Sequence, residues 1–118
     1  MILAVGLDLV EVSRIAEAME NPSFVERILT PKERETVHTP LRVAGRWAAK
    51  EAVAKAVGLH LSWQDVEILN GPDGKPDVAI HHSDWNPAQR RIHLSITHEK
   101  GHAAAVAILE GVQADSGS

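Results

Sequence analysis

The sequence predicts an α+β fold in which helices come first, an antiparallel sheet comes later, and the first strand joins that sheet. Leu41–Val57 is rich in alanine and is followed by Gly58, a pattern typical of a helix that ends on a left-handed residue. Residues 92–97 alternate between apolar and polar side chains, as in a half-buried strand. With 118 residues, we expect one compact domain over residues 1–110 and a polar, flexible tail over 111–118.

One strand and several short helices are expected before the long helix. Met1–Asp8 is apolar at almost every position, which predicts a strand that is buried on both faces. Ser13 is expected to cap a short helix that ends near Glu20, and Ser23–Leu29 is expected to form a second helical turn. Thr30-Pro31-Lys32-Glu33 has the form of a capping box with proline at the first helical position, so a third helix is expected to begin there.

Strands are expected after the long helix. Val66–Leu69 and Asp77–His81 flank a run of turn residues at 70–74, which predicts two strands joined by a turn. Ser83–Gln89 is expected to be a loop or one irregular turn. Ala103–Leu109 is expected to be the last strand, after a short turn at Glu99–Gly101.

Composition and charge exclude several classes of function. The chain contains no cysteine, which excludes disulfides and thiolate metal sites. The apolar start lacks a basic region and is interrupted by Asp8 and Glu11, which argues against a signal peptide or a membrane span, so a cytoplasmic location is expected. The formal charge of −4 disfavours nucleic-acid binding. Residues 14–55 nevertheless carry a local excess of basic side chains, which suggests an anionic ligand or partner.

Three ionisable side chains are the leading candidates for chemistry. Glu51 and Lys55 are four residues apart in the predicted helix and share one face, where they can equally form an ordinary solvated ion pair. Asp8 follows the first strand directly, and its alternative role is a helix cap or a turn. If the strand end and the helix face the same cleft, two carboxylates and one ammonium group converge, which is sufficient for magnesium together with substrate phosphates. Spacing alone does not decide between these alternatives.

The histidines do not predict a zinc site. His81 and His82 are adjacent and point to opposite faces of a strand, so they do not easily share a metal ion. His98 and His102 lie on either side of a predicted turn, and no cysteine supplements them. We expect these histidines to be surface residues or hydrogen-bonding residues.

Several segments resemble the signatures of one family, the holo-acyl-carrier-protein synthases. Gly6-Leu7-Asp8 with Arg14 resembles the pattern G-x-D-x-x-x-x-x-R, and residues 46–58 resemble W/F-x-x-K-E-A-x-x-K. Leu94-Ser95-Ile96-Thr97-His98 resembles the closing S-x-S/T-H strand of that family. Lesser matches are Phe24, Arg27, Thr30, Glu33, residues 63–68 and residues 74–76. The resemblance covers Ile2 to Leu109, although the segment 83–91 is shorter than in relatives.

The resemblance implies the phosphopantetheinyl transferase fold and a magnesium-dependent enzyme. This enzyme would move 4'-phosphopantetheine from coenzyme A to a serine of an apo-acyl carrier protein, release adenosine 3',5'-bisphosphate and support fatty acid biosynthesis. It also implies a homotrimer with active sites between subunits, without nucleic-acid or membrane partners.

The resemblance also assigns roles to single residues. Asp8 and Glu51 would bind magnesium, and Glu51, directly or through a metal-bound water, would take the serine proton. The catalytic set would be Asp8, Glu51 and Lys55. The contacts to coenzyme A would be Arg46, Lys50, Lys55 and His98. The docking residues for the carrier protein would be Arg14 and Arg27.

Two other classes of function remain open from the residues alone. A magnesium-dependent phosphohydrolase or nuclease uses the same combination of Asp, Glu and Lys. A non-catalytic binding module would use Asp8 as a cap and Glu51–Lys55 as a surface pair.

Overall fold

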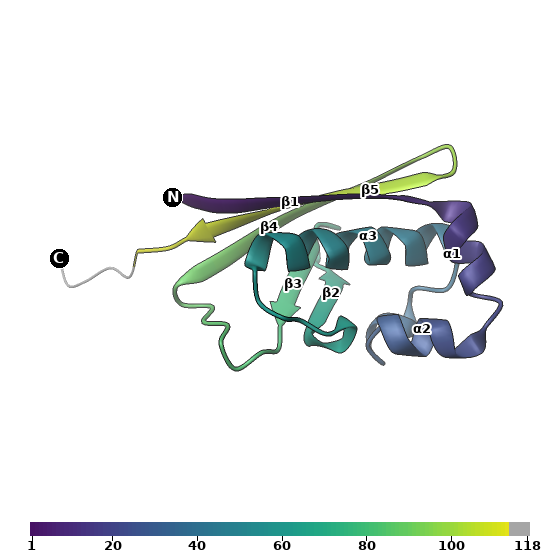
Figure 1. The fold of residues 1–118 in the computed structure, drawn as a ribbon, viewed down its shortest axis with the longest axis horizontal. Helices are drawn as coiled ribbons and strands as arrows, with labels where there is room; N and C mark the ends of the chain where they lie inside the picture. The colour runs from purple at the N-terminus through teal and green to yellow at the C-terminus, as the bar shows by residue number, and fades with distance from the viewer. Residues whose placement is uncertain (114–118) are drawn as a thin grey trace.

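A long helix lies across one face of a three-stranded antiparallel sheet, and a smaller hairpin and two short helices complete the molecule (Figure 1). The computed structural model describes residues 1–113. The elements in chain order are β1 (Ile2–Glu11), α1 (Val12–Ala18), α2 (Pro22–Ile28), η1 (Glu33–Glu35), α3 (Pro40–Val57), η2 (Trp63–Asp65), β2 (Val66–Asn70), β3 (Pro76–Ile80), β4 (Arg90–Glu99) and β5 (His102–Gly111). The large sheet has the order β1-β5-β4, and β2 pairs with β3 in a second sheet. The predicted α+β fold is therefore confirmed.

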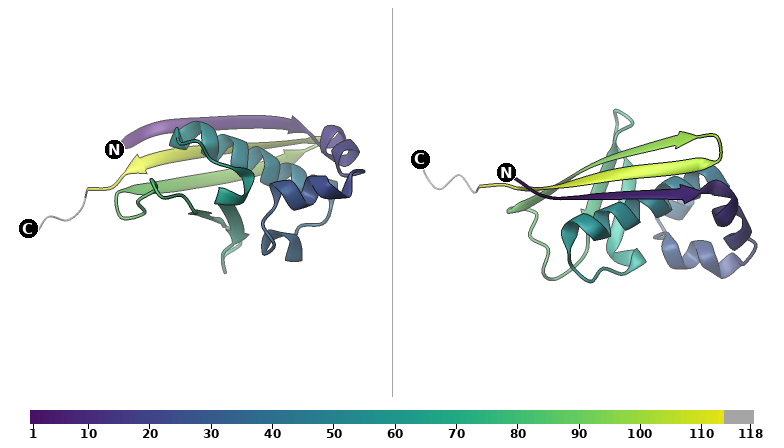
Figure 2. Two further views of the ribbon diagram at one scale, coloured as in Figure 1. Left: turned by 60° about the horizontal axis from the view of Figure 1, so that its bottom comes forward. Right: turned by 45° about the horizontal axis from the view of Figure 1, so that its top comes forward.

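The first strand does join the C-terminal sheet, where it pairs antiparallel with the central strand β5. Only one of its faces is buried, because α3 covers a single face of the sheet (Figure 2). Gly6 and Val10 point to α3, whereas Leu7 and Leu9 on the other face are 65% and 66% exposed. The expectation of a strand buried on both faces is wrong for the single chain.

A glycine allows β1 and α3 to approach closely. A Cβ atom at Gly6 would lie 1.9 Å from the carbonyl oxygen of Ala52 and 3.0 Å from the amide nitrogen of Ala56. No side chain fits in this space, so Gly6 permits direct contact between the two backbones. Small residues also allow α3 to pack closely on β5, since Ala48 of α3 and Ala105 of β5 are almost fully buried. This contact brings the middle of β1, which includes Asp8, next to the C-terminal half of α3.

The long helix has the ends that its sequence predicts. The Thr39 hydroxyl accepts a hydrogen bond from the Arg42 amide, and Pro40 occupies the first turn. Gly58 closes the helix in the left-handed region with φ of 73°. The five predicted strand segments are also confirmed, and residues 83–89 form an irregular loop. Their bounds differ in two places: β1 continues three residues beyond Asp8, which therefore does not end the strand, and β3 ends at Ile80, so that His81 lies outside it.

The second short helix, predicted at Ser23–Leu29, is confirmed as α2, whereas the first and the third differ from their predictions. The first helix, α1, begins at Val12 with Glu11 at the cap position, so Ser13 is not the cap. The third predicted helix is only the single turn η1. Both hydrogen bonds of the Thr30–Glu33 capping box are present, but the Glu33 carboxylate is fully buried and also binds groups outside this turn. The Glu33 side chain lies in the core, and the helical turn ends at Glu35.

The C-terminal end of the chain is described only in part. Gly111 ends β5, and residues 114–118 of the expected tail lie outside the described residues. Within residues 1–113, no helix combines the length and the apolar character that a membrane crossing needs.

Candidate active site

Asp8 and Lys55 meet where β1 passes the C-terminal half of α3. Asp8 lies on the same face of β1 as Gly6, and its side chain is 16% exposed. The Lys55 ammonium donates to Asp8 Oδ1 at 3.2 Å and to the Leu7 carbonyl oxygen at 2.9 Å. The Lys55 side chain remains 53% exposed, so this ion pair is open to solvent and to ligands. Sequence spacing alone did not establish this contact, because the partners are 47 residues apart.

Glu51 lies one helical turn before Lys55 and is partly exposed. It borders a pocket of about 210 Å³ together with Ser62, Trp63 and Val66. The strand β1 thus carries one carboxylate, Asp8. The helix α3, which packs against β1, carries the carboxylate of Glu51 and the ammonium group of Lys55. Within the described residues, no group of three or more acidic or histidine side chains converges as a ready-made metal cage.

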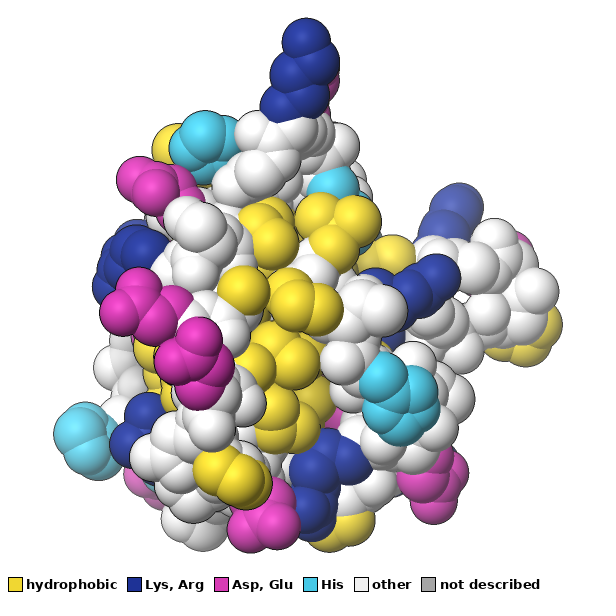
Figure 3. All heavy atoms as spheres, turned by 90° about the vertical axis from the view of Figure 1, so that its right-hand side faces the viewer, with side chains coloured by type: hydrophobic (Ala, Val, Ile, Leu, Met, Phe, Trp, Pro, Cys, Tyr) yellow, Lys and Arg dark blue, Asp and Glu magenta, His cyan; other side chains and the backbone are white. Residues whose placement is uncertain are grey.

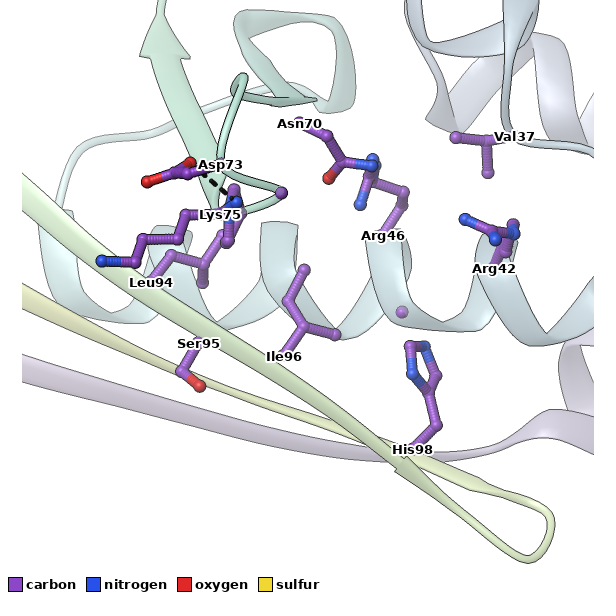
Figure 4. Close-up of a pocket in the computed structure, with 13 residues that line it drawn as sticks. Val37, Arg42, Arg46, Asn70, Asp73, Lys75, Leu94, Ser95, Ile96 and His98 are labelled. Carbon is purple, nitrogen blue, oxygen red and sulfur yellow. Dashed lines mark hydrogen bonds between the residues drawn. The ribbon is translucent and has the colours of Figure 1, made fainter.

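A second cleft, of about 480 Å³, lies between the N-terminal half of α3, β4 and the turn between β2 and β3 (Figure 4). Its basic side chains come from all three of these segments: Arg42, Arg46, Lys75 and His98. Asp73 is the acidic side chain in its lining. The cleft therefore favours an anionic ligand.

Arg46 is buried in the wall of this cleft. The residue is 9% exposed, and its Nε atom is buried without a hydrogen-bond partner. Burial lowers the pKa of Arg46, while the nearby Glu33 acts in the opposite direction, and a guanidinium stays protonated in proteins. An unpaired buried donor costs free energy, which a polar ligand can recover.

Gly45 lets His98 reach the same cleft. A Cβ atom at Gly45 would lie 2.7 Å from Nε2 of His98 and 3.3 Å from a methyl carbon of Ile96. Glycine therefore permits the close passage of β4 across α3, and the His98 ring stands in the cleft close to the helix (Figure 4). Of the residues expected to contact coenzyme A, Arg46 and His98 share this cleft, whereas Lys55 lies with Asp8.

Lys50, which was expected to contact coenzyme A, is buried inside the protein. Its side chain is 2% exposed, and its ammonium donates to Glu33 Oε1 at 2.6 Å, to the Ile28 carbonyl at 2.7 Å and to the Trp63 carbonyl at 3.0 Å. These three bonds use all three N–H donors of the ammonium group. The expected contact with a phosphate of coenzyme A does not fit this buried and fully bonded side chain.

The two arginines expected to dock a carrier protein lie on the short helices. Arg14 on α1 and Arg27 on α2 are both exposed, and the Arg27 guanidinium lies over the Phe24 ring at 5.8 Å from its centre. Figure 3 shows the end of the molecule that includes α1, where charged side chains surround an area of hydrophobic ones.

Three residues of these sites were not predicted. Glu33 was named as part of a capping box and as a lesser family match, but its burial and its cationic partner Lys50 were not predicted. Arg42 lies in the first turn of α3, and its place in the cleft depends on β4, which is distant in the sequence. Lys75 belongs to the β2–β3 turn, and no local pattern indicates that this turn folds towards α3.

Comparisons with known proteins identify the family of this chain. Residues 4–108 match the family model described as the 4'-phosphopantetheinyl transferase superfamily. The holo-[acyl-carrier-protein] synthase of Anoxybacillus flavithermus is 42% identical over 93% of this chain and 97% of its own length. That of Shouchella clausii is also 42% identical, over 93% of this chain and 99% of its own length.

Solved structures agree as well. The Bacillus anthracis holo-(acyl-carrier-protein) synthase, solved in complex with CoA (3',5'-ADP), matches with a TM-score of 0.82 and 37% identity over 95% of this chain and 99% of its own. The Mycobacterium tuberculosis acyl carrier protein synthase matches with a TM-score of 0.79 and 36% identity, over 95% of this chain and 100% of its own. The chain therefore belongs to the 4'-phosphopantetheinyl transferase superfamily, among the holo-[acyl-carrier-protein] synthases.

Proposed function

We propose that this chain transfers the 4'-phosphopantetheine group of coenzyme A to a serine of an apo-acyl carrier protein and so supports fatty acid biosynthesis. The observation that carries the proposal is the pairing of Asp8 with Lys55 where β1 meets α3, one turn from Glu51. The names of the relatives and the coenzyme A complex of the Bacillus anthracis structure support the same reaction.

The transfer exchanges one phosphorus–oxygen bond for another. The serine oxygen bonds to the phosphorus that carries the pantetheine arm, and the bond from that phosphorus to the bridging oxygen of the pyrophosphate breaks. Adenosine 3',5'-bisphosphate leaves with the electron pair. Glu51 takes the serine proton, directly or through one water molecule. Lys55 has an exposed ammonium group that can move from Asp8 to the phosphate oxygens and neutralise their charge.

The donor set fits magnesium, which we propose as the metal of this enzyme. Magnesium takes oxygen ligands and is commonly held by one or two carboxylates, with waters and substrate phosphates in the other positions. Asp8 and Glu51 would hold it, and Asp8 already accepts a cation in the form of the Lys55 ammonium group. When bound, the metal would neutralise charge on the pyrophosphate oxygens.

The basic cleft is the proposed site for the nucleotide part of coenzyme A. Arg46 and His98 were expected there, and Arg42 and Lys75 now join them. The positive charge of Arg46 in the wall of the cleft supports this assignment, because a guanidinium group forms strong hydrogen bonds with phosphate oxygens.

Docking of the carrier protein is assigned to Arg14 and Arg27. Both are exposed and lie on α1 and α2, and α1 directly follows the strand that carries Asp8. Exposed cations here would attract an acidic partner and raise the rate of encounter.

We also propose a homotrimer that works in the cytoplasm, with active sites at subunit interfaces. The uncovered face of β1 supports self-association, since Ile2, Val5, Leu7 and Leu9 are 59% to 66% exposed in the single chain. Light scattering on the purified protein should give three times the chain mass, and Leu7→Lys with Leu9→Lys should give the mass of one chain.

Mass spectrometry of an apo-acyl carrier protein tests the reaction. Incubation with this protein, magnesium and coenzyme A should add the mass of one phosphopantetheine group to the carrier serine. Omitting magnesium, or replacing the serine of the carrier protein by alanine, should prevent the addition. If several apo carrier proteins remain unmodified, the proposed function is wrong.

A further inference from the structure

Lys50 and Glu33 form a buried ion pair that joins distant segments of the chain. Their side chains are 2% and 0% exposed, and Nζ lies 2.6 Å from Oε1. The same ammonium group binds the Ile28 carbonyl at the end of α2 and the Trp63 carbonyl in η2. The proposed chemistry uses none of these groups directly.

The carboxylate of Glu33 extends the network in two further directions. Its Oε1 atom accepts from the Thr30 amide at 2.8 Å, and its Oε2 atom accepts from the Ile68 amide of β2 at 3.0 Å. The Thr30 hydroxyl in turn donates to Oε2 of Glu67 at 2.6 Å. The ion pair thus fixes α3 against the end of α2, η1, η2 and β2 at the same time.

Stability by itself does not explain such a pair. Well-packed apolar residues of similar volume often replace a buried ion pair without loss of stability, because both charges must first leave water. Apolar residues, however, do not form directional hydrogen bonds. Each hydrogen bond of this pair has good geometry at only one rotation and one axial position of α3.

The next residue along the helix is Glu51. It lies about 1.5 Å further along the axis and about 100° around it, so an anchored Lys50 also fixes the backbone of Glu51. Lys50 also binds the carbonyl of Trp63, and Glu51, Trp63 and Lys50 line the same pocket of about 210 Å³. The Lys50 ammonium group thereby fixes the backbone of Glu51 and also that of Trp63, which lines the same pocket.

We infer that Lys50 and Glu33 are positioning residues for Glu51: their buried pair sets the place and direction of the Glu51 carboxylate and of the Trp63 wall beside it. This inference rests on the proposed function, in which Glu51 holds the metal and takes the serine proton. Partners that orient a metal ligand typically change metal affinity or activity about 10-fold to 100-fold when they are replaced.

The test replaces both partners together, because a single change would leave one buried charge unpaired. The variant is Glu33→Gln with Lys50→Met, and the matched control is Lys32→Met with Glu35→Gln, two exposed residues that flank Glu33 closely. Circular dichroism and light scattering check that each variant is folded. Binding of Mn²⁺ is measured by the loss of the free-ion signal in electron paramagnetic resonance, and kcat and KM are measured with carrier protein.

We expect the buried double variant to bind Mn²⁺ about 10-fold to 100-fold more weakly and to lose kcat by a similar factor. Its KM for carrier protein should stay within about twofold of the wild-type value, since Arg14 and Arg27 are untouched, and the control should match the wild type in every measurement. Glu33→Gln with Lys50→Gln retains neutral donors at the same place and should recover part of the Mn²⁺ affinity. If the first variant does not fold, the same measurements are made on this second variant.

The outcomes separate this inference from the proposed function. A folded double variant with wild-type Mn²⁺ affinity and kcat overturns the positioning role, while transfer by the wild type still supports the proposed function. A wild type that transfers nothing removes the proposed function, yet weaker Mn²⁺ binding in the double variant still supports positioning of Glu51. A wild type that binds no Mn²⁺, with or without coenzyme A, overturns the positioning role as well.

Discussion

Two lysines of the same helix, Lys50 and Lys55, each meet a carboxylate and yet have opposite surroundings. Lys50 is 2% exposed and binds Glu33 and two carbonyl groups inside the protein. Lys55 is 53% exposed and binds Asp8 and one carbonyl group at the surface. The two residues are five positions apart, so they face different sides of α3.

The difference shows that burial decides what an ion pair can do. The ammonium group of Lys50 has no donor left for a ligand, and burial lowers its pKa while Glu33 acts in the opposite direction. The ammonium group of Lys55 can leave Asp8 for a phosphate at little cost in free energy, because water can take its place as a partner of the Asp8 carboxylate. We therefore assign Lys50 to the structure of the proposed site and Lys55 to its proposed chemistry.

The largest effect is expected when Lys50 alone is replaced. Lys50→Met leaves the fully buried Glu33 carboxylate without its cation, which should lower the free energy of unfolding by about 3–5 kcal/mol. Urea denaturation followed by circular dichroism measures this loss, with Lys32→Met in the neighbouring turn as the control. A loss below about 1 kcal/mol would mean that the buried pair is not what distinguishes the two lysines.

The next effect is expected on the reaction. Glu51→Gln keeps the size and polarity of the side chain but removes a charged oxygen ligand and the proposed base, so kcat should fall by more than about 100-fold. The melting temperature should stay close to that of the wild type, because Glu51 is partly exposed. Transfer at the wild-type rate by the folded variant would refute the metal and base assignments together.

A smaller effect is expected on coenzyme A binding at the cleft. In Gly45→Ala, the new Cβ atom would meet Nε2 of His98 at 2.7 Å, so the imidazole must move within the cleft. We expect the KM for coenzyme A to rise about tenfold, which corresponds to about 1.4 kcal/mol. Gly111→Ala is the control, since its Cβ atom would meet the Leu3 side chain at 3.1 Å and Gly111 does not line this cleft. Equal KM values for the two variants would remove His98 from the proposed coenzyme site.

The smallest effect is expected on stability when Lys55 is replaced. The Asp8–Lys55 pair is half open to solvent, so Lys55→Met should change the free energy of unfolding by less than about 1 kcal/mol. The same variant should nevertheless transfer phosphopantetheine more slowly. Urea denaturation and the mass-spectrometric assay test the two halves of this prediction. If Lys55→Met lowered the free energy of unfolding as much as Lys50→Met does, burial would not distinguish the two lysines.

Local chemistry in the sequence was enough to determine much of this protein. The ends of α3 follow from Thr39-Pro40 and Gly58, and β4 follows from its alternating side chains, because caps and periodicity act over a few residues. The candidate residues Asp8, Glu51 and Lys55 also came from the sequence, through their spacing and their resemblance to a family.

Tertiary contacts decided the rest. The packing of α3 on one side of the sheet left Leu7 and Leu9 exposed, and the third predicted helix became a single turn in which Glu33 is fully buried. Lys50 and Lys55 look equivalent in a helical pattern, but Lys50 meets a carboxylate 17 residues away and Lys55 meets one 47 residues away. Spacing places a side chain on a face of a helix, whereas the groups that cover that face come from distant parts of the chain, so the role of each lysine was set by the fold.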